Sequence, residues 1–101
     1  AYLQIASAYL KKQQIDRATE IYKKILELDP DNFAASINLA NTYMKKDQVD
    51  KAIDIYLNIL INNPDDVIAF YNLGLAHLRK GDYNNAMECF EKILKMTEVN
   101  R

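Results

Sequence analysis

Apolar residues recur along this chain at the spacing of amphipathic helices, in segments separated by short polar breaks. The run from Leu39 to Met44 places apolar side chains at i, i+1, i+4 and i+5, which is one stripe of a helix with 3.6 residues per turn. The run from Ala52 to Leu60 gives a second stripe of the same period, and the polar segment 45–48 separates the two. The pattern predicts an all-α protein with helices over residues 2–12, 16–28, 33–46, 50–62, 67–80 and 84–97.

The same pattern occurs three times at an offset of 34 residues. The coinciding positions carry small, aromatic or aliphatic side chains: Ala18, Ala52 and Ala86; Tyr22, Tyr56 and Phe90; Ile25, Ile59 and Ile93; Leu26, Leu60 and Leu94. We divide the chain into a first copy over 1–32 that is truncated at its N-terminus, a second over 33–66 and a third over 67–101. Short loops make consecutive helices antiparallel, so each copy is expected to be a helical hairpin.

The polar breaks carry residues that end and begin helices. Gly81 suits the left-handed conformation that follows a helix, and Gln13 and Asp47 stand at the same position in the other copies, at a small expected cost. The segments 29–32 and 63–66 separate the copies and supply Asp and Asn as N-caps for the next helix. Small residues at equivalent places on both helices of a hairpin, such as Ala40 and Ala52, are expected where the two backbones approach most closely.

Composition narrows the function classes. The chain of 101 residues has a net charge of −1, which gives no basic footprint for nucleic acid. One Cys and one His argue against a disulfide framework or a zinc site, and no Gly-rich phosphate loop is present, so we predict no cofactor and no metal. No apolar run is long enough to span a membrane. The chain opens inside an amphipathic pattern, so we expect it to be a segment of a longer protein.

The repeat resembles the tetratricopeptide repeat, a helix-turn-helix unit of 34 residues. The third copy matches its pattern best, with a large residue, Leu-Gly, Tyr, Ala and an aromatic residue at Phe70, Leu73, Gly74, Tyr83, Ala86 and Phe90. The chain departs from the pattern at Ser36 in place of the large residue, at His77 in place of Tyr, and at Glu98 in place of the closing Pro. The last change predicts that the sixth helix continues past Thr97.

The resemblance implies a right-handed α-solenoid in which the first helix of each hairpin lines a concave groove for an extended peptide or a partner helix. Mapped onto this chain, the candidate peptide-binding residues are Leu3, Ser7, Lys11, Ile37, Asn38, Asn41, Met44, Lys45, Tyr71, Asn72, Leu75 and Arg79. The Asn side chains carry both a donor and an acceptor and are suited to pair with a peptide backbone, although Asn is also common on solvated helix faces. The basic residues Lys11, Lys45 and Arg79 are better explained by helix C-terminal charge compensation than by a site for acidic segments.

Some members of this family grip the C-terminal carboxylate of a chaperone with a clamp of basic and Asn side chains. The matching positions here are Leu3, Ser7, Asn38, Ile68 and Asn72, of which only Asn38 agrees. Without the basic residues the main attraction for a carboxylate is lost. We therefore predict a protein-interaction scaffold that is not a carboxylate-clamp adaptor.

Catalysis is the weaker alternative. His77 stands where the other copies have Tyr9 and Tyr43, and Cys89 stands where they have Ile21 and Ile55, so both are expected to be packing residues. A Cys–His nucleophile has no evident third group to orient it. Two further alternatives stay open. One is a structural segment that associates through an uncapped C-terminal helix at Phe90, Ile93 and Leu94, and the other is the regulatory part of an enzyme whose catalytic domain lies elsewhere.

Overall fold

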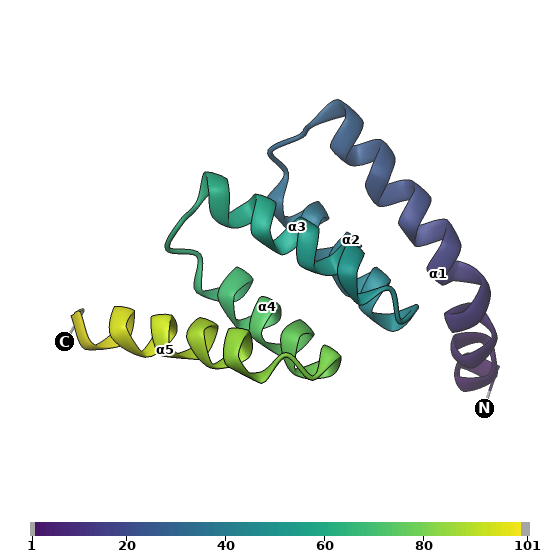
Figure 1. Ribbon diagram of the computed structural model, residues 1–101. Coiled ribbons are helices and arrows are strands. Elements are labelled where there is room, and N and C mark those ends of the chain that lie inside the picture. The colour runs from purple at the N-terminus through teal and green to yellow at the C-terminus, as the bar shows by residue number, and fades with distance from the viewer. Residues whose placement is uncertain (1, 100–101) are drawn as a thin grey trace.

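A computed structural model describes the backbone of residues 2–99 and the side chains of residues 14–98. That part of the chain forms five helices, α1 (Tyr2–Leu28), α2 (Phe33–Lys45), α3 (Val49–Asn62), α4 (Val67–Lys80) and α5 (Tyr83–Val99). Each helix packs against the next one along the chain, which gives a row of antiparallel hairpins from the N-terminus to the C-terminus (Figure 1). The predicted all-α array of stacked hairpins is confirmed.

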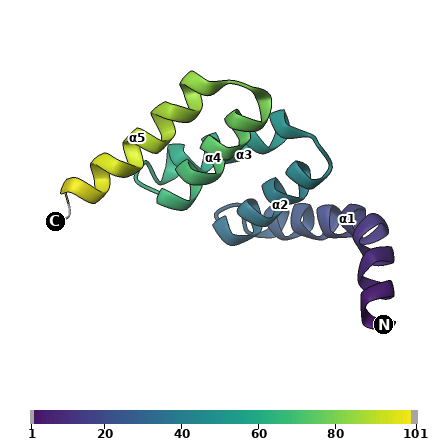
Figure 2. The same ribbon diagram turned by 90° about the horizontal axis from the view of Figure 1, so that it is seen from below.

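The N-terminal region differs from the prediction. The two helices predicted over 2–12 and 16–28 are one helix, α1, so the expected break at 11–14 is wrong. The equivalent loop positions in the other copies are left-handed, with φ of 62° at Asp47 and 80° at Gly81. Gln13 would adopt that conformation at a cost of about 1–2 kcal/mol, whereas Lys and Gln are good helix formers, so the helix continues. Figure 2 shows that the first turns of α1 run at an angle to the rest of it.

The ends of the other helices agree with the sequence-based boundaries to within two residues because their caps are encoded locally. The side-chain oxygen of Asn32 accepts a hydrogen bond from the backbone N–H of Ala35, and that of Asp66 accepts one from Ala69, both at 3.0 Å. Gly81 ends α4 in the left-handed conformation, as predicted. The last helix, α5, continues to Val99, which confirms the effect of losing the closing Pro.

The core lies where small residues let the helices approach. Ala40 on α2 and Ala52 on α3 are completely buried, and so is Ala86 on α5, which lies in the hairpin that α5 forms with α4. Larger apolar side chains fill the space around them, namely Leu39, Tyr43, Ile53, Tyr56, Phe70 and Leu73. Burying each of these large apolar side chains contributes about 1.5–3 kcal/mol, so the repeated packing positions account for the fold. The remaining positions are free to form surfaces.

Candidate functional site

Helix α4 carries an exposed row of apolar side chains that its own fold does not use. The row consists of Ile68, Tyr71, Leu75 and Leu78, spaced by three, four and three residues along one face of the helix. Ile68 is 62% exposed and Tyr71 is 53% exposed, whereas Phe70 and Leu73 on the opposite face are buried in the core. A contiguous exposed apolar row is a candidate contact surface, and we call these four residues the α4 row.

Helix α2 presents a more polar surface at the equivalent positions. Asn38 and Lys45 are exposed, while Ile37, Asn41 and Met44 are half-buried, and Ile37 and Met44 pack partly on the core. A hydrogen bond of 2.8 Å from Arg79 Nη1 to the backbone oxygen of Met44 joins the C-terminal end of α4 to that of α2. We call these α2 residues, together with the α4 row, Asn72 and Arg79, the first-helix surface. Its predicted members Leu3, Ser7 and Lys11 lie outside the residues whose side chains are described.

The side chain of Asn41 is hydrogen-bonded to a buried tyrosine of the neighbouring helix. The hydroxyl group of Tyr56 on α3 donates a hydrogen bond of 2.8 Å to Oδ1 of Asn41. Tyr56 is only 1% exposed, and burial raises the pKa of its phenol to about 12. Tyr56 was predicted to be a packing residue, and its polar role was not predicted. The sequence signal for that role is the hydroxyl group that Tyr22 and Tyr56 carry and Phe90 lacks.

Asn72 on α4 is tied to its own helix. Its side-chain Nδ2 donates a hydrogen bond of 3.0 Å to the backbone oxygen of Ile68, one turn earlier. The amide is half-buried, and its Oδ1 takes no part in this bond. Both side-chain amides are therefore fixed in orientation, that of Asn41 through its oxygen Oδ1 and that of Asn72 through its nitrogen Nδ2.

The row of basic residues is largely engaged within the array. Lys46 pairs with Asp16 at 2.7 Å, and Lys80 pairs with Asp50 at 2.6 Å, so the same ion pair recurs one repeat later. The hydrogen bond and ionic contact with Asp50 raise the pKa of Lys80. Arg79 caps the C-terminal end of α2 through Met44 O, as described above, and lies 3.5 Å from Asp47. These contacts favour the structural interpretation of the row, with Lys45 left exposed.

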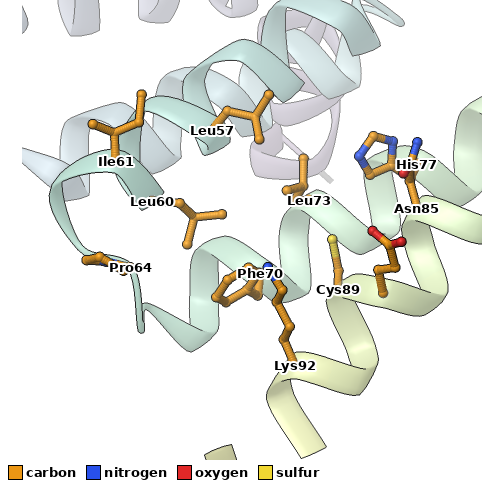
Figure 3. Close-up of a pocket in the computed structure, with 11 residues that line it drawn as sticks. Leu57, Leu60, Ile61, Pro64, Phe70, Leu73, His77, Asn85, Cys89 and Lys92 are labelled. Carbon is orange, nitrogen blue, oxygen red and sulfur yellow. The ribbon is translucent and has the colours of Figure 1, made fainter. Parts of the chain in front are cut away.

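A pocket of about 520 Å³ lies between α3, α4 and α5, apart from the first-helix surface (Figure 3). Its walls are mainly apolar and include Leu57 and Ile61 of α3, both of which are exposed. One sequence signal points to it, because the first copy has Lys23 and Glu27 at those two positions. The remaining lining residues are Leu60, Pro64, Phe70, Leu73, His77, Asn85, Glu88, Cys89 and Lys92.

His77 and Cys89, the two residues considered for a nucleophilic pair, both line this pocket. Cys89 is buried, and that burial raises the pKa of its thiol, so the reactive thiolate is disfavoured at neutral pH. His77 is partly buried and its Nδ1 lies 3.9 Å from the Asp82 carboxylate. Packing roles were predicted for both residues, and their burial agrees with them. Among the described residues, no group of three or more His, Cys, Asp or Glu side chains is placed to hold a metal ion, and no helix is long and apolar enough to cross a bilayer.

The outer face of α5 is less covered than the equivalent face of α3. Met87 is 58% exposed, whereas its equivalent Ile53 is 8% exposed beneath the neighbouring helices. Leu94 and Tyr83 are also exposed, but Ile93 packs partly on the core and Phe90 lies against Gly74. The exposed edge predicted at Phe90, Ile93 and Leu94 therefore consists of Tyr83, Met87 and Leu94.

Stacked helical hairpins with an exposed surface along their first helices define an α-helical repeat scaffold of the protein-interaction class. Two family models described as tetratricopeptide repeat match the sequence, one over residues 9–78 and the other over residues 67–96. The chain belongs to the tetratricopeptide repeat family. A search of the curated proteins finds no match.

Solved structures show the same fold. A tetratricopeptide repeat protein from Parabacteroides merdae is 26% identical with a TM-score of 0.80, over 94% of this chain and 37% of that one. A MamA protein is 26% identical with a TM-score of 0.74, over 97% of this chain and 54% of that one. The second repeat domain of Spaghetti (RPAP3), bound to the HSP90 peptide SRMEEVD, is 24% identical with a TM-score of 0.73, over 90% of this chain and 84% of that one. This chain thus spans about a third of the length of the Parabacteroides merdae protein and about half of the length of the MamA protein.

Proposed function

We propose that this chain is a non-catalytic binding module that takes an extended peptide or a partner helix on its first-helix surface. The observation that carries the proposal is the α4 row, an apolar face that the fold leaves exposed beside the oriented amides of Asn41 and Asn72. An apolar row supplies the burial that drives association, and the amides supply hydrogen bonds that fix a backbone.

The proposed ligand is not a chaperone tail held by a carboxylate clamp. At the clamp positions of the third copy the surface has the exposed apolar Ile68 and the amide of Asn72, neither of which attracts a carboxylate as a cation does. Arg79 and Lys80, at the end of α4, are engaged with Asp47 and Asp50, and the exposed Lys45 on α2 does not stand at a clamp position. We therefore expect the peptide SRMEEVD to bind no better than a scrambled peptide of the same composition.

The proposal is tested with a peptide selected from a random-peptide display library, whose affinity is then measured by fluorescence anisotropy. The double variant Tyr71→Ala/Leu78→Ala removes the middle and end of the α4 row, and we expect its affinity to fall by at least about tenfold, as truncation of a central aromatic contact does. Asn38→Ala combined with Asn72→Ala should also weaken binding with little change in melting temperature. Ile61→Ala, an exposed apolar residue of the pocket in Figure 3, is the matched control and should bind as the parent does. A library that yields no binder, or a binder unaffected by Tyr71→Ala/Leu78→Ala, would overturn the proposal.

A second candidate function is assembly through the outer face of α5. It is supported by the contrast between exposed Met87 and buried Ile53, because α4 covers α3 at the equivalent place. A helix with the small and apolar pattern of α4, from a following repeat or from a second copy, would bury Tyr83, Met87 and Leu94. Multi-angle light scattering should then show a concentration-dependent mass for the parent and a lower mass for Leu94→Asp. If both proteins are monomeric at every concentration, self-assembly through this face is wrong.

A further inference from the structure

We infer that the two oriented amides have opposite hydrogen-bonding roles, with Asn41 a donor to a carbonyl oxygen of the bound peptide and Asn72 an acceptor from one of its N–H groups. Tyr56 is the positioning residue that gives Asn41 its role. This inference rests on the proposed peptide-binding function and adds which atoms of the peptide each helix recognises.

The role of Asn41 follows from the burial of Tyr56. A phenol that is 1% exposed needs an acceptor for its proton, since leaving a buried donor without a partner costs about 1–3 kcal/mol. Oδ1 of Asn41 is that acceptor. Turning the amide over would place its NH₂ group against the hydroxyl and leave the phenolic proton without its acceptor. The amide is therefore held with its two N–H donors available to a ligand.

The role of Asn72 follows from its bond to Ile68. One of its N–H donors is used by the backbone oxygen of Ile68, which leaves Oδ1 as the group best able to meet a ligand N–H. A peptide backbone has carbonyl acceptors and N–H donors in alternation, so it satisfies Asn41 on α2 and Asn72 on α4 at the same time. A ligand that presents only acceptors, such as a phosphate, satisfies only one of them.

The third copy has neither the amide donor of Asn41 nor the tyrosine hydroxyl that orients it. At the position equivalent to Asn41 it has Leu75, and at the position equivalent to Tyr56 it has Phe90. The buried hydroxyl and the amide are thus lost together, and the Phe90 ring instead packs near Tyr71, with centroids 6.3 Å apart and an interplanar angle of 57°. The first-helix surface is polar over α2 and apolar over α4. Its ligand is an extended segment with a backbone carbonyl over α2 and a large apolar side chain over the α4 row.

The two roles are separated by converting each Asn to Asp and measuring the affinity of each variant for the display-selected peptide. Asn41→Asp keeps an oxygen for the Tyr56 hydroxyl but removes the donors, so its melting temperature should stay close to that of the parent while its affinity falls at least about tenfold. Asn72→Asp loses the bond to Ile68 O but keeps acceptor oxygens for a ligand N–H, so its affinity should fall clearly less than that of Asn41→Asp. Both substitutions add the same charge, so each serves as the control for the other.

The positioning role of Tyr56 is tested by a double-mutant cycle. Tyr56→Phe should weaken binding in the parent but cause no further loss in an Asn41→Ala background, because it acts only through that amide. Tyr83→Phe, at an exposed tyrosine, should leave affinity unchanged. If Asn41→Asp binds normally while Asn72→Asp does not, or if Tyr56→Phe has the same effect in both backgrounds, the inference is overturned and the proposed function stands. If no peptide is selected at all, the proposed function fails and this inference fails with it.

Discussion

The ring of Phe90 lies against the backbone of Gly74, so that a Cβ built on Gly74 would be only 2.7 Å from Cε1 and Cζ of the ring. Gly74 on α4 thus lies directly against α5, and the contact leaves no room for a methyl group. The equivalent pair in the preceding hairpin is Ala40 with Tyr56, whose ring is directed so that its hydroxyl reaches Asn41. The same packing position thus makes a polar contact in the second copy, between Tyr56 and Asn41, and an apolar contact in the third copy, between Phe90 and Gly74.

We expect Gly74→Ala to destabilise the protein by about 1–3 kcal/mol, because the added methyl group overpacks a full core. Urea denaturation followed by circular dichroism at 222 nm measures the change. Combining Gly74→Ala with Phe90→Leu should recover part of the loss, since the smaller side chain makes room. A Gly74→Ala protein as stable as the parent would show that the ring is free to move.

Gly81→Ala tests backbone conformation without a steric contact. Nothing lies within 4 Å of a Cβ at Gly81, so the only expected cost is that of the left-handed φ of 80°, about 1–2 kcal/mol. The reverse change at the equivalent position, Asp47→Gly, should be neutral or stabilising by up to about 1 kcal/mol, since φ there is 62°. The same denaturation experiment decides, and a stabilising Gly81→Ala would contradict the left-handed end of α4.

Stability should depend on the ionisation of Tyr56 at high pH. Its pKa is raised from 10.0 to about 12 in the folded protein, so the phenol ionises more readily in the unfolded chain. The contribution of the neutral phenol is fully present below pH 10 and is lost as the pH rises toward 12. Free energies of unfolding measured from pH 9 to pH 12 should therefore fall less steeply in Tyr56→Phe than in the parent. Parallel curves for the two proteins would show that the phenol is not shielded from solvent.

The contacts between successive copies should differ in their sensitivity to salt. Arg79 donates a hydrogen bond to Met44 O at the end of α2 in addition to its ionic contact with Asp47, whereas Lys80 contacts Asp50 through an exposed ion pair. We expect Arg79→Met to lower the free energy of unfolding by about 0.5–1.5 kcal/mol at low salt and to retain most of that effect at about 1 M NaCl. The smaller effect of Lys80→Met should disappear at the same salt concentration. Equal salt dependence in the two variants would contradict the distinction.

A glycine at position 13 should interrupt α1. The other two copies reverse direction at a left-handed residue, and Gln13 is the residue that lacks this freedom. In the parent, ¹³Cα chemical shifts of residues 11–14 should be helical, and in Gln13→Gly they should move toward random-coil or left-handed values. A helix that persists unchanged in Gln13→Gly would mean that contacts elsewhere, rather than this residue, keep α1 continuous.

The sequence predicted those features that depend on local chemistry or on the 34-residue period. The N-caps at Asn32 and Asp66, the helix end at Gly81 and the packing positions all agree with the structure, because each depends on neighbouring residues or on one face of a helix. The division into three copies and the full set of peptide-binding residues remain predictions. The helix break predicted at residues 11–14 was wrong. It was inferred from the 34-residue period, but the Lys and Gln residues at that place favour a helix.

The sequence by itself determined the all-α repeat, its family and the repeated packing positions, since these follow from periodicity and side-chain size. Tertiary structure alone decided which polar groups meet. The Tyr56 hydroxyl bonds to Asn41 fifteen positions away, Arg79 reaches the end of α2, and the same Lys–Asp pair links successive copies. Such partners come from different helices, and their meeting depends on how the helices are rotated and spaced when packed. The α4 row likewise becomes a surface only because the opposite face of the same helix fills the core.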